Sequence, residues 1–318
     1  RRPLMTHRVL TPLAAVAFAA LLTSTLVAGQ GFGGPQFPAT GNVDGTHWSR
    51  LVNVAAAGKV VFGSFTPDKS PDSAIAASRN TLPDFWFYDM EHTPFGIETF
   101  RTWLQFTIDP AQILRNGRIL ITPTLVRLPT NGREMNQWMI KQVLDQGAMG
   151  VIVPHVENAA QARNIVQASR YPHRPDDPTY EPAGQRGSGA GNAMRFLGVP
   201  PQDYMRKADV YPLDPDGEIF NILLIENQEG VKNVREIAQV PGVSAIAAAP
   251  GDLNTAYVGD REAVEQAIQT ILAACKEFKM ICAITAGPND VERRIKEGFN
   301  LLIGGDDMIR AGHKAAGR

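Results

Sequence analysis

The sequence predicts an α/β fold, and within that class a (β/α)8 TIM barrel. Short runs of β-branched and aromatic residues alternate with stretches whose apolar residues recur every three or four positions, the pattern of strands alternating with amphipathic helices. Eight strand-like runs occupy about 250 residues, which is what an eight-stranded barrel requires. A doubly wound sheet is the competing α/β solution, but the runs are short and polar residues gather at their carboxyl ends.

The expected elements follow one another along most of the chain. The clearest helical patterns are residues 135–147 and 260–278, where apolar residues recur at helical spacing. Residues 171–217 interrupt the alternation, and most of 171–191 is expected to be loop because it is rich in Pro and Gly. A loop of this length inside a compact domain is usually functional or disordered. The expected strands are residues 59–65, 84–89, 119–127, 150–156, 220–226, 243–250, 280–286 and 301–306.

Residues 1–29 have the pattern of a secretory signal peptide. A short basic stretch precedes an apolar run that ends in small residues, and no acidic residue occurs before Asp44. An uncleaved amino-terminal membrane anchor is the alternative, because the run is nearly long enough to span a bilayer. Cleavage is favoured, since Pro12 and several Thr and Ser residues weaken a spanning helix. The sequence therefore predicts an exported protein, periplasmic or secreted, with a Gly/Pro-rich linker at 30–45 and a barrel domain at 46–318.

Composition is that of an ordinary globular protein. The 318 residues are 44% hydrophobic and 20% charged, and the formal net charge is −1. Nothing in this balance favours a nucleic-acid partner. After residue 29 no stretch is long and apolar enough to span a membrane.

The chain has two cysteines, Cys275 and Cys282. They form no Cys-x-x-Cys zinc pattern, and in an oxidising compartment they could pair. They lie on either side of an expected helix-to-strand junction, where both side chains would pack inward. The interpretation favoured from the sequence is two buried free thiols.

Polar residues follow several of the expected strands. Asp89 and His92 follow the second strand, Arg127 closes the third, Glu226 ends the fifth and Asp252 follows the sixth. Catalytic groups in a barrel come from the carboxyl ends of different strands, so these side chains are expected to meet at one barrel mouth. Each also has a structural explanation on its own. Asp252, for example, could cap the next helix, and Arg127 could form a surface ion pair.

The chemistry of this set indicates metal-assisted proton transfer. Two carboxylates without nearby Cys or several His residues favour a hard cation, Mg²⁺ or Mn²⁺. Arg127 could stabilise a developing enolate oxygen, and His92, oriented by Asp89, could move a proton near neutral pH.

Several segments resemble the HpcH/HpaI family of class II, metal-dependent pyruvate aldolases. They are DMEHTP, TLVRLP, KQVLDQGAMGVIVPHV, RGSGAG, LLIENQEGVKNVREIAQVPGVSAIAAAPGDL and LLIGGDDM, in order over residues 50–306. The resemblance implies a barrel of the phosphoenolpyruvate/pyruvate-type superfamily that forms a homo-oligomer, a hexamer or a trimer of dimers. It also implies a divalent metal, Mg²⁺ or Mn²⁺ with Co²⁺ as a further option, bound by Glu226 and Asp252.

The same resemblance implies roles for the other residues. Arg127 would stabilise the pyruvate enolate, and the backbone amides of Gly251 and Asp252 would bind the pyruvate carboxylate. His92, paired with Asp89, would take part in the proton transfers. Another acid, in the KQVLD segment, resembles one that reaches a neighbouring subunit's site, or else it is an exposed helix carboxylate; it is Asp145.

The sequence departs from the family pattern around the substrate pocket. Leu224 stands where the family often has a Gln that helps to bind the oxo acid. The loop that follows Arg127 and the turn within 171–191 are both longer than in the family. The expected binding partners are therefore a 2-oxo acid and an aldehyde, but not the family's usual substrates.

The function expected from the sequence is a lyase. It would cleave a 4-hydroxy-2-oxo acid reversibly to pyruvate, or a related 2-oxo acid, and an aldehyde, through a metal-stabilised enolate. One alternative is an acyl-CoA lyase similar to the citrate lyase β chain, although no basic patch for the CoA phosphates is evident. Another is an exported barrel that binds an oxo acid without turning it over.

Overall fold

The computed structural model describes residues 47–66, 68–116 and 122–318. The expected signal peptide and linker lie outside these residues, as does the beginning of the third expected strand. No helix in the described part of the chain has the length and apolar character needed to cross a bilayer.

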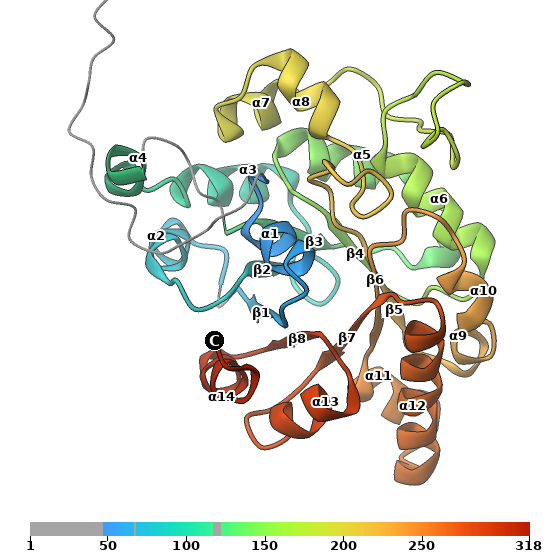
Figure 1. The fold of residues 1–318 in the computed structure, drawn as a ribbon. Coiled ribbons are helices and arrows are strands. Elements are labelled where there is room, and N and C mark those ends of the chain that lie inside the picture. The colour runs from blue at the N-terminus through green and yellow to red at the C-terminus, as the bar shows by residue number, and fades with distance from the viewer. Residues whose placement is uncertain (1–46, 67, 117–121) are drawn as a thin grey trace, which may run out of the picture. The chain divides into compact units, whose positions relative to one another are not determined.

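Eight parallel strands form a closed barrel in which each strand is hydrogen-bonded to its neighbours in sequence and β8 returns to β1 (Figure 1). The expected (β/α)8 barrel is confirmed, and the doubly wound sheet is excluded. All eight expected strands are present, although each is shorter than expected, at its beginning, at its end or at both. The strands are β1 Val61–Phe65, β2 Phe85–Asp89, β3 Thr124–Arg127, β4 Val151–Val153, β5 Ile222–Ile225, β6 Ala245–Ala248, β7 Ile281–Thr285 and β8 Leu301–Gly304.

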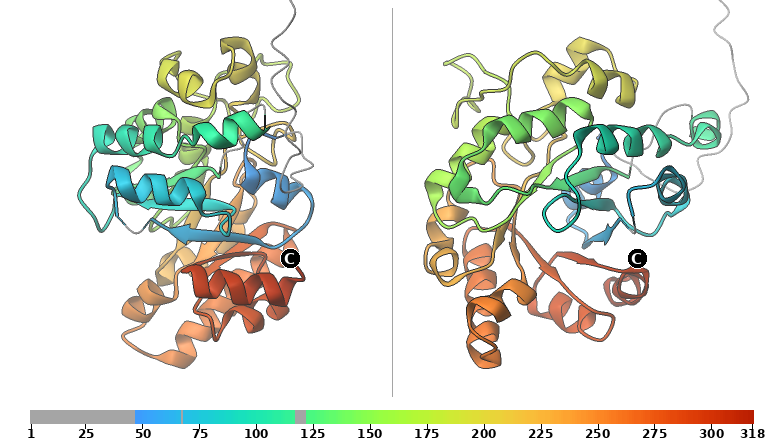
Figure 2. Two further views of the ribbon diagram at one scale, coloured as in Figure 1. Left: turned by 90° about the vertical axis from the view of Figure 1, so that its left-hand side faces the viewer. Right: turned by 180° about the vertical axis from the view of Figure 1, so that it is seen from behind.

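Helices surround the strands on the outside of the barrel, as the three views show (Figures 1 and 2). The helical patterns expected at 135–147 and 260–278 are confirmed as α5 and α12. The helices are α1 Arg50–Ala56, α2 Pro71–Arg79, α3 Ile97–Phe106, α4 Pro110–Asn116, α5 Gln137–Gln146, α6 Ala159–Ser169, α7 Gly191–Leu197, α8 Pro201–Lys207, α9 Gln228–Lys232, α10 Val234–Ala238, α11 Pro250–Ala256, α12 Arg261–Glu277, α13 Val291–Glu297 and α14 Asp306–Ala316, with a 3-10 turn at Gly132–Glu134.

Alternate residues of each strand fill the barrel interior, and this alternation decides which side chains reach the mouth. Phe85 and Phe87 of β2 belong to the interior cluster, and the small residues Ala245 and Ala247 of β6 lie on the opposite side of the barrel. Gly63 of β1 leaves room for Phe85, since a Cβ atom there would lie 2.2 Å from the Phe85 ring. Because every second side chain points inward, the next inward side chain of each strand lies at the carboxyl end of the barrel.

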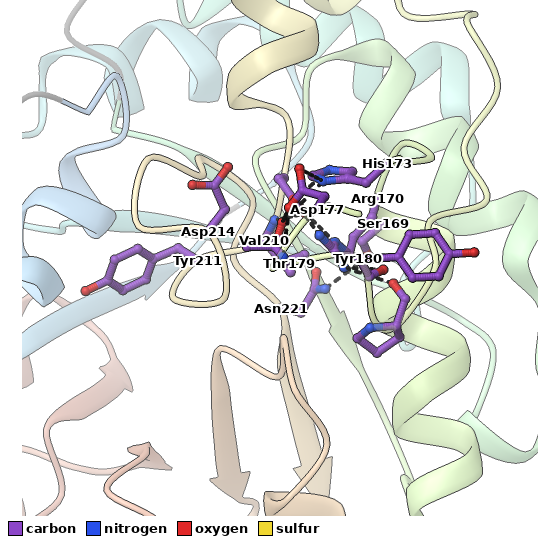
Figure 3. Close-up of polar contacts among 12 residues, drawn as sticks. Ser169, Arg170, His173, Asp177, Thr179, Tyr180, Val210, Tyr211, Asp214 and Asn221 are labelled. Atoms are coloured by element: carbon purple, nitrogen blue, oxygen red, sulfur yellow. Dashed lines mark hydrogen bonds and ion pairs between the residues drawn. The ribbon is translucent and has the colours of Figure 1, made fainter. Parts of the chain in front are cut away.

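The excursion after α6 is a loop, as expected, because residues 170–190 contain no helix or strand. Arg170 is fully buried, and its guanidinium donates to both carboxylate oxygens of Asp209 and to the carbonyl oxygen of Pro182. His173 adds a second contact, with its Nε2 atom 3.0 Å from Oδ2 of Asp209. These contacts fasten the loop to the segment that leads into β5 (Figure 3).

Cys275 and Cys282 form a disulfide, so the expectation of two free thiols is wrong. Both side chains do pack inward, each 1% exposed. The chain reverses between the end of α12 and the start of β7, which brings the two Cα atoms to 5.7 Å, a separation at which cysteines can be bonded. Burial and pairing are therefore compatible at this junction.

Removing the disulfide is expected to destabilise the barrel. The disulfide joins two residues that are 7 positions apart in the sequence. Closing a loop of this length lowers the conformational entropy of the unfolded chain and so stabilises the folded protein by about 2 to 3 kcal/mol. The double variant Cys275→Ala/Cys282→Ala should therefore melt several degrees below the wild-type protein in calorimetry. Equal melting temperatures, with the wild-type bond verified by mass spectrometry, would contradict a stabilising role.

Candidate active site

A cavity of about 370 Å³ opens at the carboxyl ends of the strands. Five of the seven residues expected in the site line it, while Asp89 lies behind Arg127 and Asp145 lies elsewhere. The remaining wall is mostly apolar and includes Leu224, which stands where the resembling family often has a Gln. The five lining residues are His92, Arg127, Glu226, Gly251 and Asp252.

Asp89 and Arg127 are joined by two side-chain hydrogen bonds. They are register partners at the ends of β2 and β3, and Arg127 donates from Nε and Nη2 to the two Asp89 oxygens at 2.8 and 2.7 Å. Burial opposes the charge on Asp89, but the hydrogen bonds and charge of Arg127, with backbone N–H groups from Glu91 and His92, outweigh it and lower the pKa of Asp89. Asp89 therefore stays ionised and fixes the guanidinium at the mouth.

Glu91 is a third member of this cluster. Its Oε2 lies 3.1 Å from Nη1 of Arg127 and 3.4 Å from Nε2 of His92. Burial raises the pKa of Glu91, although the positive charge of Arg127 opposes the rise. The expected pairing of the His92 imidazole with Asp89 is not what the structure shows: only the backbone N–H of His92 contacts Asp89, at 3.4 Å, and the imidazole lies against Glu91.

Glu226 follows β5 and is 2% exposed. Its Oε2 accepts the backbone N–H of His155 at 2.8 Å, and the imidazole Nδ1 of His155 lies 3.5 Å from the same oxygen. His155 has a φ of 48°, a left-handed conformation that aims its N–H at the carboxylate. Burial raises the pKa of Glu226 to about 8, the His155 N–H opposes the rise, and the nearby charges of Asp252 and Glu91 add to it.

The donor set fits a hard divalent cation. Glu226 and Asp252 both line the cavity, and the charge of Asp252 adds to the rise in the pKa of Glu226 that burial mainly causes. A cation between them would relieve the repulsion between their charges, and carboxylate oxygens suit Mg²⁺ or Mn²⁺. Within the described residues no group of three or more His, Cys, Asp and Glu side chains is arranged to hold a metal. A cation held by Glu226 and Asp252 alone would have its other positions filled by water and substrate, an arrangement typical of Mg²⁺.

Asp145 lies near the end of α5 and not at this cavity. Nη2 of Arg186 donates to it at 2.8 Å, and the Arg186 side chain is fully buried, with its guanidinium 4.4 Å from the ring centre of Tyr171. A place in a neighbouring subunit's site stays a prediction for Asp145.

Three polar residues at or beside the cavity were not predicted as site residues. Glu91 stands two positions after Asp89, so the alternation of an extended chain was the signal that could have placed both on one side. His155 follows Pro154 within the fourth expected strand, and its contact with Glu226 depends on the left-handed turn. Thr285, the last residue of β7, lines the cavity as the next inward position after Ala283.

The family model described as HpcH/HpaI aldolase/citrate lyase matches residues 62–312. A hydroxypyruvate/pyruvate aldolase of Delftia acidovorans is 33% identical over 236 residues, which cover 71% of this chain and 74% of that protein. A 4-hydroxy-2-oxo-heptane-1,7-dioate aldolase of Shigella sonnei is 33% identical over 204 residues, covering 61% of this chain and 65% of that protein.

The solved structures agree. The crystal structure of an HpcH/HpaI aldolase/citrate lyase family protein from Burkholderia cenocepacia J2315 has a TM-score of 0.62 and 25% identity to this chain, covering 81% of this chain and 93% of that one. The resemblance noted in the sequence is confirmed, and the relatives named as aldolases make this protein an enzyme of the class II aldolase type. The chain belongs to the HpcH/HpaI aldolase/citrate lyase family.

Proposed function

We propose that this protein cleaves a 4-hydroxy-2-oxo acid reversibly to pyruvate, or a closely related 2-oxo acid, and an aldehyde, with the help of a divalent cation. The observation that carries the proposal is one cavity in which Arg127, fixed by Asp89, lies within electrostatic range of the buried Glu226. A positive group opposite a carboxylate pair is the arrangement that enolate chemistry needs.

The 2-oxo acid would bind at the β6 side of the cavity. Gly251 and Asp252 lie in the first turn of α11, where backbone N–H groups have no partner within the helix and can meet a carboxylate. A Cβ atom on Gly251 would meet no atom within 4 Å, so this wall is open to a ligand. The chemistry that Mg²⁺ or Mn²⁺ would supply between Glu226 and Asp252 is stabilisation of negative charge on the 2-oxo oxygen.

The chain's own residues would handle charge and protons. In the direction of addition, a proton passes from C3 of pyruvate to the His92 imidazole, directly or through a water molecule, and Arg127 stabilises the enolate oxygen that gains the charge. C3 then attacks the aldehyde carbon, a carbon–carbon bond forms, and the aldehyde oxygen takes up a proton to become the 4-hydroxyl group. His92 lines the cavity with a side chain 61% exposed, so it can exchange the transferred proton with water. Cleavage runs through the same steps in reverse.

We also propose that the protein works outside the cytosol. The signal-peptide pattern of residues 1–29 supports export, and so does the Cys275–Cys282 disulfide, because disulfides persist mainly in oxidising compartments.

A homohexamer is the proposed assembly, and light scattering with the purified protein would test it.

Deuterium exchange into pyruvate tests the first step without knowledge of the aldehyde. The purified protein, pyruvate and Mg²⁺ or Mn²⁺ are incubated in D₂O, and the C3 methyl signal is followed by proton NMR. We expect metal-dependent loss of the signal that EDTA stops. A folded protein that gives no exchange above the blank with Mg²⁺, Mn²⁺ or Co²⁺ would argue against pyruvate as the enolate donor.

A further inference from the structure

A second cavity, of about 470 Å³, adjoins the first at the barrel mouth. The two cavities share three lining residues, Phe65, Thr285 and Ile303, at the ends of β1, β7 and β8. The second cavity continues away from Glu226 and Arg127 over the loops that follow β7 and β8. A ligand bound in the first cavity could therefore extend into the second cavity.

We propose that this second cavity binds the aldehyde half of the substrate and that it accepts uncharged aldehydes. The inference rests on the proposed function, since a carbon–carbon bond cleaved in the first cavity must join the 2-oxo acid to a group lying beside it. The shared wall at Thr285 is where the two halves would meet.

The walls of the second cavity leave space for an aliphatic or hydroxylated chain. The loop after β7 begins Ala286–Gly287, and the loop after β8 begins with Gly305. A Cβ atom on Gly287 or Gly305 would meet no atom within 4 Å. Phe65 supplies an apolar face that is 41% exposed, with its ring 4.8 Å from that of Phe87. Thr285 supplies a hydroxyl at the junction that can bind an aldehyde or hydroxyl oxygen.

The charged residues that line the second cavity, Arg294 and Asp290, are both already paired with neighbouring side chains. Among its described lining residues Arg294 is the one cation. Arg294 donates to both oxygens of Glu265 at 2.7 and 2.8 Å and to Glu297 at 2.9 Å, and hydrogen bonds from Arg294 lower the pKa of Glu265 to about 2. Asp290, on the same wall, accepts from Arg293 at 3.2 Å.

Arg294 is thus committed to two carboxylates, and Asp290 places a further carboxylate on the wall of the cavity. A carboxylate at the far end of the aldehyde would find no uncommitted cation among the described lining residues and would be repelled by Asp290. An uncharged aldehyde has no such cost, which is the physical basis of the proposed preference.

Two four-carbon aldehydes test the charge preference in the unmodified enzyme. Butanal and succinic semialdehyde have the same carbon chain length, and the second carries a carboxylate. We expect kcat/KM for addition of pyruvate to be at least tenfold higher with butanal. Equal values, or a preference for succinic semialdehyde, would overturn the proposal. Failure of the enzyme to exchange deuterium into pyruvate when no aldehyde is present would instead contradict the proposed function.

Filling the cavity tests its location. Gly287→Leu and Gly305→Leu each add a side chain in open space on the proposed acceptor wall, and Gly191→Leu makes the same change at an exposed glycine that opens α7. The quantity compared is the rate of butanal addition divided by the rate of deuterium exchange into pyruvate.

We expect this ratio to fall at least tenfold in Gly287→Leu and Gly305→Leu and to stay within twofold of wild type in Gly191→Leu. An unchanged ratio in both cavity variants would place the aldehyde elsewhere. If both variants lost pyruvate exchange altogether, the comparison of the two aldehydes with the wild-type enzyme would still decide the proposal.

Discussion

Replacing Glu226 by Gln is expected to abolish metal-dependent deuterium exchange of pyruvate and to stabilise the metal-free protein at alkaline pH. The two effects have one cause, because Glu226 is a buried carboxylate whose charge is useful only when a cation neutralises it. Gln has the same shape as the protonated acid but cannot ionise, so it removes the proposed metal ligand and an electrostatic cost together.

The sign of the pH effect follows from the raised pKa of Glu226. In the unfolded chain the carboxyl loses its proton near its ordinary value of 4.5, whereas in the folded, metal-free protein it does so near pH 8. The folded state binds the extra proton between these values, so the free energy of unfolding of the wild type falls as pH rises through this window and levels off above it. The full loss is on the order of 5 kcal/mol, about 1.4 kcal/mol for each unit between the two pKa values, and the Gln variant lacks it.

The measurement is urea unfolding in EDTA at pH 5.5 and pH 8.5, alongside the NMR exchange assay with Mg²⁺ or Mn²⁺. Glu98→Gln, an exposed change in the first turn of α3, is the matched control and should show neither effect. Full exchange activity in Glu226→Gln would remove Glu226 from the metal site. A difference between wild type and variant that does not grow with pH would show that Glu226 ionises without hindrance.

The barrel could be predicted because three independent features of the sequence all favour the same fold. The strand-like runs are short, they alternate with helical periodicity, and their polar residues occur at one end. The ends of the strands could not be predicted, because the point at which a residue leaves the ladder depends on the neighbouring strand. Residues 150–156 illustrate this: only Val151–Val153 is paired, and His155 turns into a left-handed conformation beside Glu226.

The candidate site could be predicted as a set of positions but not as a set of contacts. Arg127 and Glu226 were placed by counting to the ends of their strands, and that count holds. Which acid pairs with which base depends on the reach of a guanidinium across two strands. Nε and Nη2 of Arg127 donate to Asp89, and Nη1 of Arg127 lies against Glu91. The His92 imidazole therefore contacts Glu91 and not Asp89.

The disulfide was missed for a related reason. Sequence showed that Cys275 and Cys282 flank a helix-to-strand junction, and inward packing alone is equally compatible with thiols. Their pairing is decided by the 5.7 Å between two Cα atoms, a distance set by how tightly the chain reverses.

Arg127→Ala is expected to slow pyruvate exchange by about 10²-fold or more, the scale of losing a donor that stabilises an oxyanion. The substitution also leaves Asp89 and Glu91, both largely buried, without their cation, so a fall in melting temperature is expected as well. Arg127→Lys keeps one positive charge but cannot bind Asp89 with two parallel donors, and its rate should lie between those of wild type and Arg127→Ala.

Chemical rescue separates the catalytic role of Arg127 from its role in holding the two acids. Guanidinium ion added at millimolar concentration can occupy the space that the alanine leaves and present the same planar donors to the enolate oxygen. We expect it to restore part of the exchange rate in Arg127→Ala and none in Glu226→Gln, whose defect lies in a carboxylate. An exchange rate in Arg127→Ala equal to that of wild type would make Arg127 a structural partner of Asp89. A slow variant that guanidinium does not rescue, and that Asp89→Asn matches in both rate and melting temperature, would point to the same conclusion, because the acid and the base would then matter only as a pair that shapes the barrel mouth.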